Sequence, residues 1–205
     1  MTLAETPTAP DGTPAIEHAA ARRAMIDSQL RTSGVSDTFV LERMRTVPRE
    51  DHVPPSARGV AYMDRAIALD GGGYIAAPVF YGALLREARP GPDDSVLMVD
   101  GGSGYLPALL APLAGSVKVV TPEEATGSLR GKFSLILVDG AVEVFPDTLA
   151  KRLADNARVV TGLIENGVTR LAIGRPAGDG IGWWRLAEMG IPRLPGFDAP
   201  KRWSF

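Results

Sequence analysis

A glycine-rich turn is the segment of this sequence best suited to bind a ligand. Gly101, Gly102 and Gly104 directly follow the apolar run of residues 95–99 and precede a helical pattern that begins at Tyr105. Backbone N–H groups in such a turn, together with the positive end of the helix, can meet a polar group of a ligand. The turn predicts a pocket for a nucleotide or for S-adenosylmethionine, and the alternative is a purely structural link between strand and helix.

Single residues argue against other chemistries at this turn. A phosphate-binding loop needs Gly-Lys-Ser/Thr, but Gly104 is followed by Tyr105. A serine nucleophile at Ser103 would need a second glycine after it and a later histidine, whereas His18 and His52 both come earlier. With two histidines and no cysteine, we expect no metal cluster, and we interpret both histidines as surface or loop residues rather than as ligands or bases.

The composition indicates one catalytic-sized α/β unit without a strong electric field. Of 205 residues, 22 are Lys or Arg and 24 are Asp or Glu, so the formal net charge is -2. This balance predicts neither nucleic acid nor an anionic membrane surface as a partner. The lack of cysteine fits a reducing compartment such as the cytoplasm. We also expect neither a signal peptide nor a membrane helix, because no run approaches roughly 20 apolar residues.

Three segments are expected along the chain. Residues 1–14 are rich in Thr, Pro and Ala and predict a flexible tail. Residues 15–89 predict a helical and loop cap, in which a first helix ends near Gly34 and Ser36 provides the N-cap of a second. Residues 90–205 predict a Rossmann-like core, because apolar β-type runs there alternate with helical ones.

The core is expected to hold a parallel sheet with an antiparallel pair at one edge. A tight turn at residues 165–168 and a strand around residues 183–186 predict that pair, and Tyr105, Trp183 and Trp184 are interpreted as core or sheet-face aromatics. The parallel strands are expected at residues 95–99, 117–121, 133–138 and 158–163, and the helices at about 105–114 and 146–154.

Asp139 is a second candidate ligand contact. It stands at the end of the apolar run FSLILVD, and the carboxyl ends of parallel strands meet at one crevice with the glycine turn. The alternative is an aspartate that caps the loop beside Gly140.

Four stretches between residues 25 and 142 resemble the protein-L-isoaspartate O-methyltransferase family, and the match as a whole covers most of the chain. They are the block MIDSQL to AIAL at residues 25–69, GGGYIAAP at 71–78, VLMVDGGSGY at 96–105 and FSLILVDGAV at 133–142. The resemblance implies a class I methyltransferase fold, S-adenosylmethionine as cofactor, and an isoaspartyl carboxylate of a protein or peptide as methyl acceptor. Such a transfer depends on positioning, so we assign no catalytic residue.

Two departures from the family pattern concern the acceptor and the turn. The family's substrate loop reads roughly Gly-Gln-Thr-Ile-Ser-Gln-Pro, and its serine is Ala76 here, which cannot donate a hydrogen bond. The family's turn reads Glu-Ile-Gly-Thr-Gly-Ser-Gly-Tyr, with Met98 at the acid and Asp100 at the first glycine. Asp100 either obstructs or caps the turn, or directs its carboxylate to the cofactor's amino group.

Two more departures follow the next strand. Where the family carries an acid that grips the ribose, this chain has Thr121, and Glu123 and Glu124 either substitute for it or start a solvated helix. Only residues 122–132 then lead to FSLILVD, where the family fits a helix, a strand and a loop. We therefore expect one edge strand and its helix to be missing.

These departures predict a degenerate family member with weak or lost S-adenosylmethionine binding and a binding or regulatory role. The alternatives are an active isoaspartyl methyltransferase and a pocket for another small ligand. The exposed sheet edge predicts self-association or a protein partner. The candidate cofactor contacts are Asp100, Gly101, Gly102, Ser103, Gly104, Tyr105, Thr121 and Asp139.

Overall fold

The main sheet has six strands in the order β4-β3-β5-β6-β7-β8. The computed structural model describes residues 15–178 and 180–199, so the tail expected at residues 1–14 lies outside the described residues. β3, β4, β5 and β6 run parallel, and β7 and β8 continue the sheet antiparallel, as the sequence predicted. The strands span Ser95–Val99 (β3), Ser116–Val120 (β4), Phe133–Val142 (β5), Leu153–Glu165 (β6), Val168–Ala177 (β7) and Gly180–Glu188 (β8).

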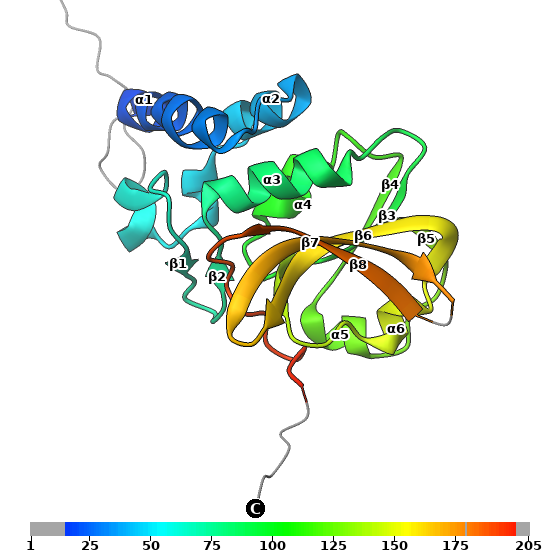
Figure 1. The fold of residues 1–205 in the computed structure, drawn as a ribbon. Coiled ribbons are helices and arrows are strands. Elements are labelled where there is room, and N and C mark those ends of the chain that lie inside the picture. The colour runs from blue at the N-terminus through cyan, green and yellow to red at the C-terminus, as the bar shows by residue number, and fades with distance from the viewer. Residues whose placement is uncertain (1–14, 179, 200–205) are drawn as a thin grey trace, which may run out of the picture.

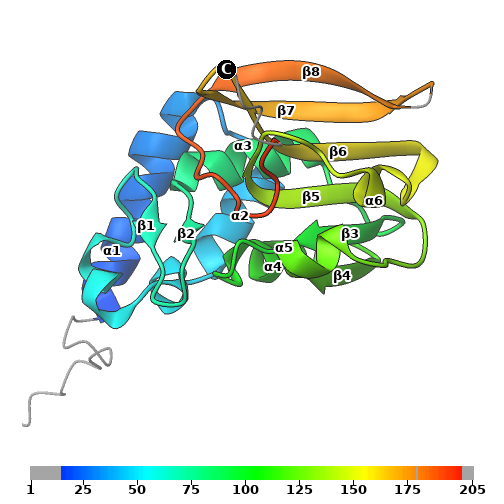
Figure 2. The same cartoon turned by 90° about the horizontal axis from the view of Figure 1, so that it is seen from below.

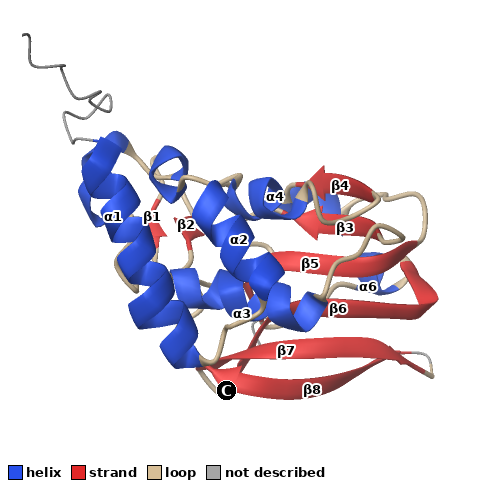
Figure 3. Ribbon diagram, turned by 90° about the horizontal axis from the view of Figure 1, so that it is seen from above, coloured by secondary structure: helices blue, strands red, loops and turns tan. Residues whose placement is uncertain are grey.

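Helices cover both faces of this sheet (Figure 1). On one face lie α3 and α4, with α1 and α2 further out; the view from above shows α1, α2 and α3 side by side (Figure 3). On the other face lie the short α5 and α6, seen from below in Figure 2. The helices span Ala15–Met25 (α1), Thr38–Thr46 (α2), Pro78–Ala88 (α3), Tyr105–Leu110 (α4), Pro122–Thr126 (α5) and Asp147–Ala150 (α6).

Alternation along β3 divides the core between the two faces. Val96 and Met98 join the apolar cluster that includes the N-terminal helices. Leu97 and Val99 join a second cluster, which contains Leu149 of α6. Because successive side chains of a strand point to opposite faces, one strand connects both layers. Because β3 is buried on both faces, it holds the turn that follows it in a fixed position.

The N-terminal helix changes its winding before it ends. α1 continues as a π-helix at Ile26–Leu30 and a 3₁₀ turn at Arg31–Ser33. It ends at Gly34, which has φ of 79° and forms the predicted left-handed cap. The prediction for Ser36 was wrong: Asp37 is the residue before α2, and its carbonyl accepts the first helical bond from Leu41.

A short hairpin links this helical part to the sheet. Two 3₁₀ turns, η3 (Arg49–His52) and η4 (Pro55–Val60), precede it. Its strands β1 (Ile67–Ala68) and β2 (Tyr74–Ile75) pair antiparallel. Residues 69–73, called the hairpin tip below, connect them, and α3 begins soon afterwards at Pro78.

The crossover from β4 to β5 is as short as the sequence indicated. It holds only α5 and residues 127–132, and β4 forms the end of the sheet beside β3. Two predicted helices are shorter than expected, since α4 ends at Leu110 and α6 at Ala150, whereas β5 and β6 are longer. The antiparallel partner β7 extends the pairing of β6 to Glu165, which apolar runs alone did not indicate.

Candidate functional site

The glycine turn after β3 is held by its own aspartate. Gly102 and Gly104 have φ of 100° and 66°, a region that favours glycine. The Gly104 amide donates to both carboxylate oxygens of Asp100, at 3.3 and 3.2 Å. Burial raises the pKa of Asp100, while the Gly104 and Gly102 amides and His52 lower it in part. Asp100 therefore caps the turn, because its carboxylate occupies an amide that a ligand would otherwise meet.

The turn packs directly on β5. A Cβ placed on Gly101 would lie 2.7 Å from the carbonyl oxygen of Asp139, so only glycine fits there. The Asp139 side chain is 3% exposed. The end of β3 therefore lies beside Asp139 within β5, and the turn and Asp139 lie together as the sequence indicated.

The hairpin tip lies against the other side of the turn. Gly73 has φ of 79°, and a Cβ on it would lie 2.9 Å from the Gly101 carbonyl oxygen. Leu69 Cδ1 is within 3.8 Å of the position that a Cβ on Gly102 would occupy. Within the tip, Leu69 N–H donates to Gly73 at 3.2 Å and Gly72 N–H donates to Leu69 at 3.0 Å. The tip thus covers part of the turn.

Asp139 connects the turn to the segment that follows the tip. Its Oδ2 accepts a hydrogen bond from the Tyr81 hydroxyl at 3.3 Å, and that hydroxyl accepts one from the Ala76 amide at 3.1 Å. Burial and then the nearby Asp100 carboxylate raise the pKa of Asp139 to about 7, against the lowering effects of Tyr81, Arg49 and the Gly101 amide. Asp139 and Gly140 both lie within β5, so the loop that Asp139 was expected to cap does not begin there, and the carboxylate faces Tyr81 and the turn.

Arg49 is a site residue that the sequence did not reveal. It is fully buried, and its Nε and Nη2 donate to the carbonyls of Ala61 and Ala76, each at 2.6 Å. Its guanidinium lies 5.7 Å from the Tyr81 ring centre and 5.4 Å from that of Tyr105. Burial lowers the pKa of its guanidinium. Its only signal was its place in the MRTVPRE run, where arginine otherwise predicts an exposed residue.

His18 differs from the sequence interpretation, whereas His52 lies in the short turn η3. His18 is 5% exposed, because α1 packs on η3 and brings His18 Nδ1 to 3.7 Å from Glu50. His52 is half-buried, with Nδ1 at 3.0 Å from the Ser103 carbonyl oxygen and its ring 5.2 Å from that of Tyr105. His52 therefore supports the outer side of the turn.

Thr121 points to its own helix rather than to the turn. Its hydroxyl accepts from the Glu124 amide at 3.2 Å, and its amide donates to Glu124 Oε2 at 2.9 Å. This capping box starts α5 and confirms the interpretation of the acidic pair as a helix start. Thr121 and Glu124, two of the groups expected beside a ribose, are therefore engaged with each other.

The fit to the cofactor that the family implies is therefore poor at two places. At the turn, Asp100 already accepts the Gly104 amide; beyond β4, Thr121 and Glu124 satisfy each other. Asp100 to Tyr105 and Asp139 come together, whereas the Thr121 side chain is used in the capping box of α5. Among residues 15–178 and 180–199, no group of three His, Cys, Asp or Glu side chains is arranged to hold a metal ion.

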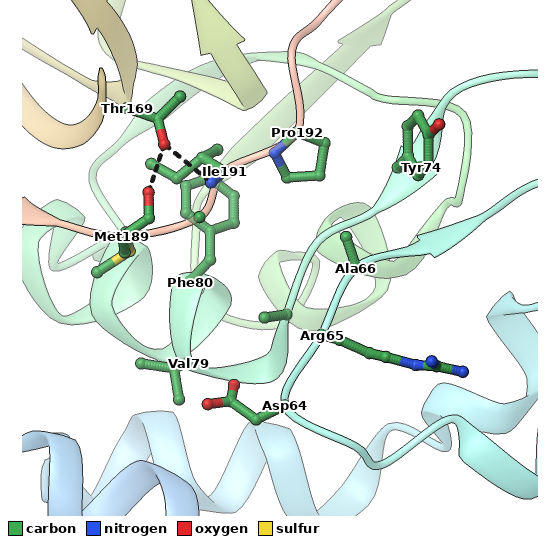
Figure 4. A pocket seen from close by; sticks show the side chains of 12 residues that line it. Asp64, Arg65, Ala66, Tyr74, Val79, Phe80, Thr169, Met189, Ile191 and Pro192 are labelled. Atoms are coloured by element: carbon green, nitrogen blue, oxygen red, sulfur yellow. Dashed lines mark hydrogen bonds between the residues drawn. The ribbon is translucent and has the colours of Figure 1, made fainter. Parts of the chain in front are cut away.

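A cavity of about 510 Å³ opens beside the segment of residues 73–77 (Figure 4). Tyr74 and Ala77 line it, whereas Gly73 and Ala76 of that segment face the turn and Arg49. Thr169 fixes another wall by accepting from the Ile191 amide at 3.2 Å and donating to Met189. The remaining lining residues are Asp64, Arg65, Ala66, Val79, Phe80, Gly190 and Pro192.

The sheet order and the turn define a class I methyltransferase type of domain, and comparisons narrow this class to a family. The family model for Protein-L-isoaspartate(D-aspartate) O-methyltransferase matches residues 20–130. A protein-L-isoaspartate O-methyltransferase of Methylorubrum extorquens is 30% identical over 210 residues, covering 90% of this chain and 87% of the relative. One of Aeropyrum pernix is 48% identical over 136 residues, covering 59% and 52%. The chain belongs to the protein-L-isoaspartate O-methyltransferase family.

Solved structures agree at the level of the fold. A putative protein-L-isoaspartate O-methyltransferase of Plasmodium falciparum, in complex with S-adenosyl-L-homocysteine, superposes with a TM-score of 0.68 at 17% identity and covers 87% of this chain and 98% of that one. A second protein-L-isoaspartate O-methyltransferase gives 0.69 at 17% identity, covering 86% and 67%. Within the described ranges, no helix has the length and apolar character needed to cross a membrane.

Proposed function

We propose that this chain keeps the isoaspartyl methyltransferase scaffold but binds S-adenosylmethionine weakly, and that it acts through binding or regulation. The observation that carries this proposal is the Asp100 carboxylate, which accepts the Gly104 amide at 3.2 Å inside the turn. A ligand carboxylate entering there would compete with that bond and meet a like charge. An unfavourable charge beside a buried ligand group weakens binding.

The ribose side supports the same proposal. The Thr121 hydroxyl and the Glu124 carboxylate complete a capping box, and α5 leads after a few residues into β5. Breaking the box to contact a ribose would cost about 1 kcal/mol of helix stability. Both ends of the expected cofactor contact are thus weakened by groups of this chain.

Calorimetric titration with S-adenosylmethionine and S-adenosylhomocysteine tests the proposal. We expect binding weaker than micromolar for the natural chain. Asp100→Gly frees the turn amides and is expected to tighten binding about tenfold, since a charge-assisted hydrogen bond contributes about 1.5 kcal/mol. Asp93→Gly, at an exposed loop position, is the matched control. Micromolar binding by the natural chain would refute the proposal.

Active methyl transfer to an isoaspartyl carboxylate is the second candidate. It is favoured by the cavity of about 510 Å³, because Tyr74 and Ala77 line this cavity while Gly73 of the same segment contacts the glycine turn. Ala76→Ser returns a hydroxyl donor to that segment and is expected to raise transfer to an isoaspartyl peptide about tenfold. Ala66→Ser, on another wall of the cavity, is the control. No transfer by either variant would remove this candidate.

The end strand β4 is a proposed contact surface for a second copy or a protein partner. Val119 on it is 46% exposed, and its outer backbone edge pairs with no other strand of the described sheet. Unpaired edges promote association. Sedimentation at increasing concentration tests self-association, and Val119→Lys should abolish it; a monomer at all concentrations would exclude the second copy.

A further inference from the structure

The buried carboxyl group of Asp139 stands where three separate elements meet. It belongs to β5, packs on the glycine turn through Gly101, and accepts the Tyr81 hydroxyl from α3. Tyr81 in turn holds the amide of Ala76, which follows the hairpin tip. One carboxyl group therefore joins the turn to the segment of residues 69–77 that covers it.

Hydrogen bonding satisfies only half of this carboxyl group. Oδ2 has the Tyr81 hydroxyl as donor, whereas Oδ1 is buried and meets no hydrogen-bond partner among the described residues. An ionised carboxylate in such a place loses hydration that the Tyr81 hydroxyl and the Gly101 amide replace only in part. The protonated form loses far less, so the closed arrangement favours a proton on Asp139.

The charged neighbours of Asp139 act in both directions. Asp100 on the turn raises its pKa, and Arg49 of η3 and the Tyr81 hydroxyl of α3 lower it. The C-terminal segment also packs on β5, but its Arg193 pairs with Glu143 and Asp198. His52 faces Asp100 from η3. Burial and Asp100 outweigh Arg49 and Tyr81, and the pKa rises to about 7.

The β1–β2 hairpin, whose tip covers the turn, is the movable part of this arrangement. β1 and β2 have two residues each and form a sheet of their own, with no strand pairing to the main sheet. An isolated two-stranded hairpin has little stability of its own. β5 and α3, in contrast, are buried in the core. Hydration of an ionised Asp139 is therefore reached most easily by displacement of the hairpin tip.

We propose that Asp139 is a positioning residue whose protonated form holds the hairpin tip, residues 69–73, closed on the glycine turn and whose ionised form releases it. Opening exposes Gly101 and Gly102 to a ligand. The proton on Asp139 thus controls access to the turn. This inference holds whether or not S-adenosylmethionine is the ligand, so its test needs no cofactor.

The direction of the pH dependence follows from the two states. In the closed state the pKa of Asp139 is about 7. In the open state, where the carboxyl group is hydrated, its pKa returns toward the ordinary 3.8. The closed form therefore binds a proton that the open form has lost between these values. The equilibrium constant for closure is therefore highest below pH 3.8. It falls about tenfold per pH unit between pH 3.8 and about 7, and it no longer changes above about pH 7.

Amide hydrogen exchange of the intact chain measures this opening. The reporters are the Leu69 and Gly72 amides, which bond within the tip, and the Val35 amide, which bonds to Leu30, is the distant control. After correction for intrinsic exchange, opening at the tip should rise about tenfold from pH 5.5 to 6.5 and level off above about 7. A rise at Val35 equal to the rise at Leu69 and Gly72 would indicate global unfolding and would overturn opening at the tip.

Variants distinguish closure that depends on the Asp139 proton from ordinary packing of the hairpin tip. Asp139→Asn keeps the shape without a titrating group, so tip opening should become independent of pH. Tyr81→Phe removes a donor that stabilises the ionised form and should move the transition to higher pH, and Asp100→Asn should move it to lower pH. These two shifts keep the test decisive if Asp139→Asn folds poorly. Equal pH dependence in the natural chain and Asp139→Asn, or no dependence in the natural chain, would overturn the inference.

Discussion

The two sides of the glycine turn differ sharply in how they are built. Toward α3, the turn meets fully buried groups, among them Arg49, Tyr81, Tyr105 and Asp139. Toward β4, it meets an end strand whose Val119 is 46% exposed and a crossover that satisfies itself through a capping box. We call these the packed side and the open side.

The difference teaches that the core does not depend on the open side. Both faces of β3 remain buried, and each apolar cluster extends across β5 and β6. Stability therefore rests on the packed side and on the central strands, because buried apolar area supplies most of the folding free energy. The open side is free to diverge.

Removing Arg49 should produce the largest loss of stability. Arg49→Ala leaves the carbonyls of Ala61 and Ala76 without their donor and opens a cavity between two tyrosine rings. We expect a loss of about 3–5 kcal/mol in urea denaturation. Arg130→Ala, in the crossover of the open side, should change stability by less than about 0.5 kcal/mol. Equal effects would remove the contrast between the two sides.

Asp139→Asn should stabilise the packed side in a pH-dependent way. Because the pKa of Asp139 is raised from 3.8 to about 7, the folded chain keeps a proton that the unfolded chain has lost. This contribution is complete below pH 3.8 and is lost as the pH rises through about 7. At pH 8 the variant should be more stable by about 2–4 kcal/mol, and near pH 4 by little. A constant difference across this range would contradict the titration of Asp139.

Gly73→Ala tests the contact between the hairpin tip and the turn. Its φ of 79° is strained for alanine, and the added Cβ would lie 2.9 Å from the Gly101 carbonyl oxygen. We expect a loss of about 1–3 kcal/mol in thermal or chemical unfolding. Gly71→Ala is the matched control, because its Cβ would have nothing within 4 Å. If the control cost as much, the tip would not lie on the turn.

The smallest effect is expected on the open side. Thr121→Ala removes the hydroxyl that accepts the Glu124 amide and should cost about 1 kcal/mol. Thr126→Ala, at the exposed end of the same helix, should cost less than about 0.5 kcal/mol. A Thr121→Ala loss above about 3 kcal/mol would show that the open side supports the core.

Much of this site was predictable because its signals are local. Residues 95–99 matched β3, and the turn followed at Asp100 because a strand, three glycines and a helical pattern are adjacent in the sequence. The short crossover was predictable because the number of residues between the two apolar runs can be counted. Glu124 lies three residues after Thr121, which is the spacing of a helix start. Helix lengths were predicted less well, since apolar periodicity does not mark where α4 and α6 stop.

The sequence by itself determined the parallel order, the glycine turn and the acid within it, because these depend on neighbours along the chain. Only the tertiary structure decided that His18 and Arg49 are buried and that Asp139 joins Tyr81 to the turn. Asp139 and Tyr81 are 58 positions apart, and Arg49 and Ala76 are 27 apart. Burial and long-range contacts set the charge of such groups, and no local pattern encodes either one.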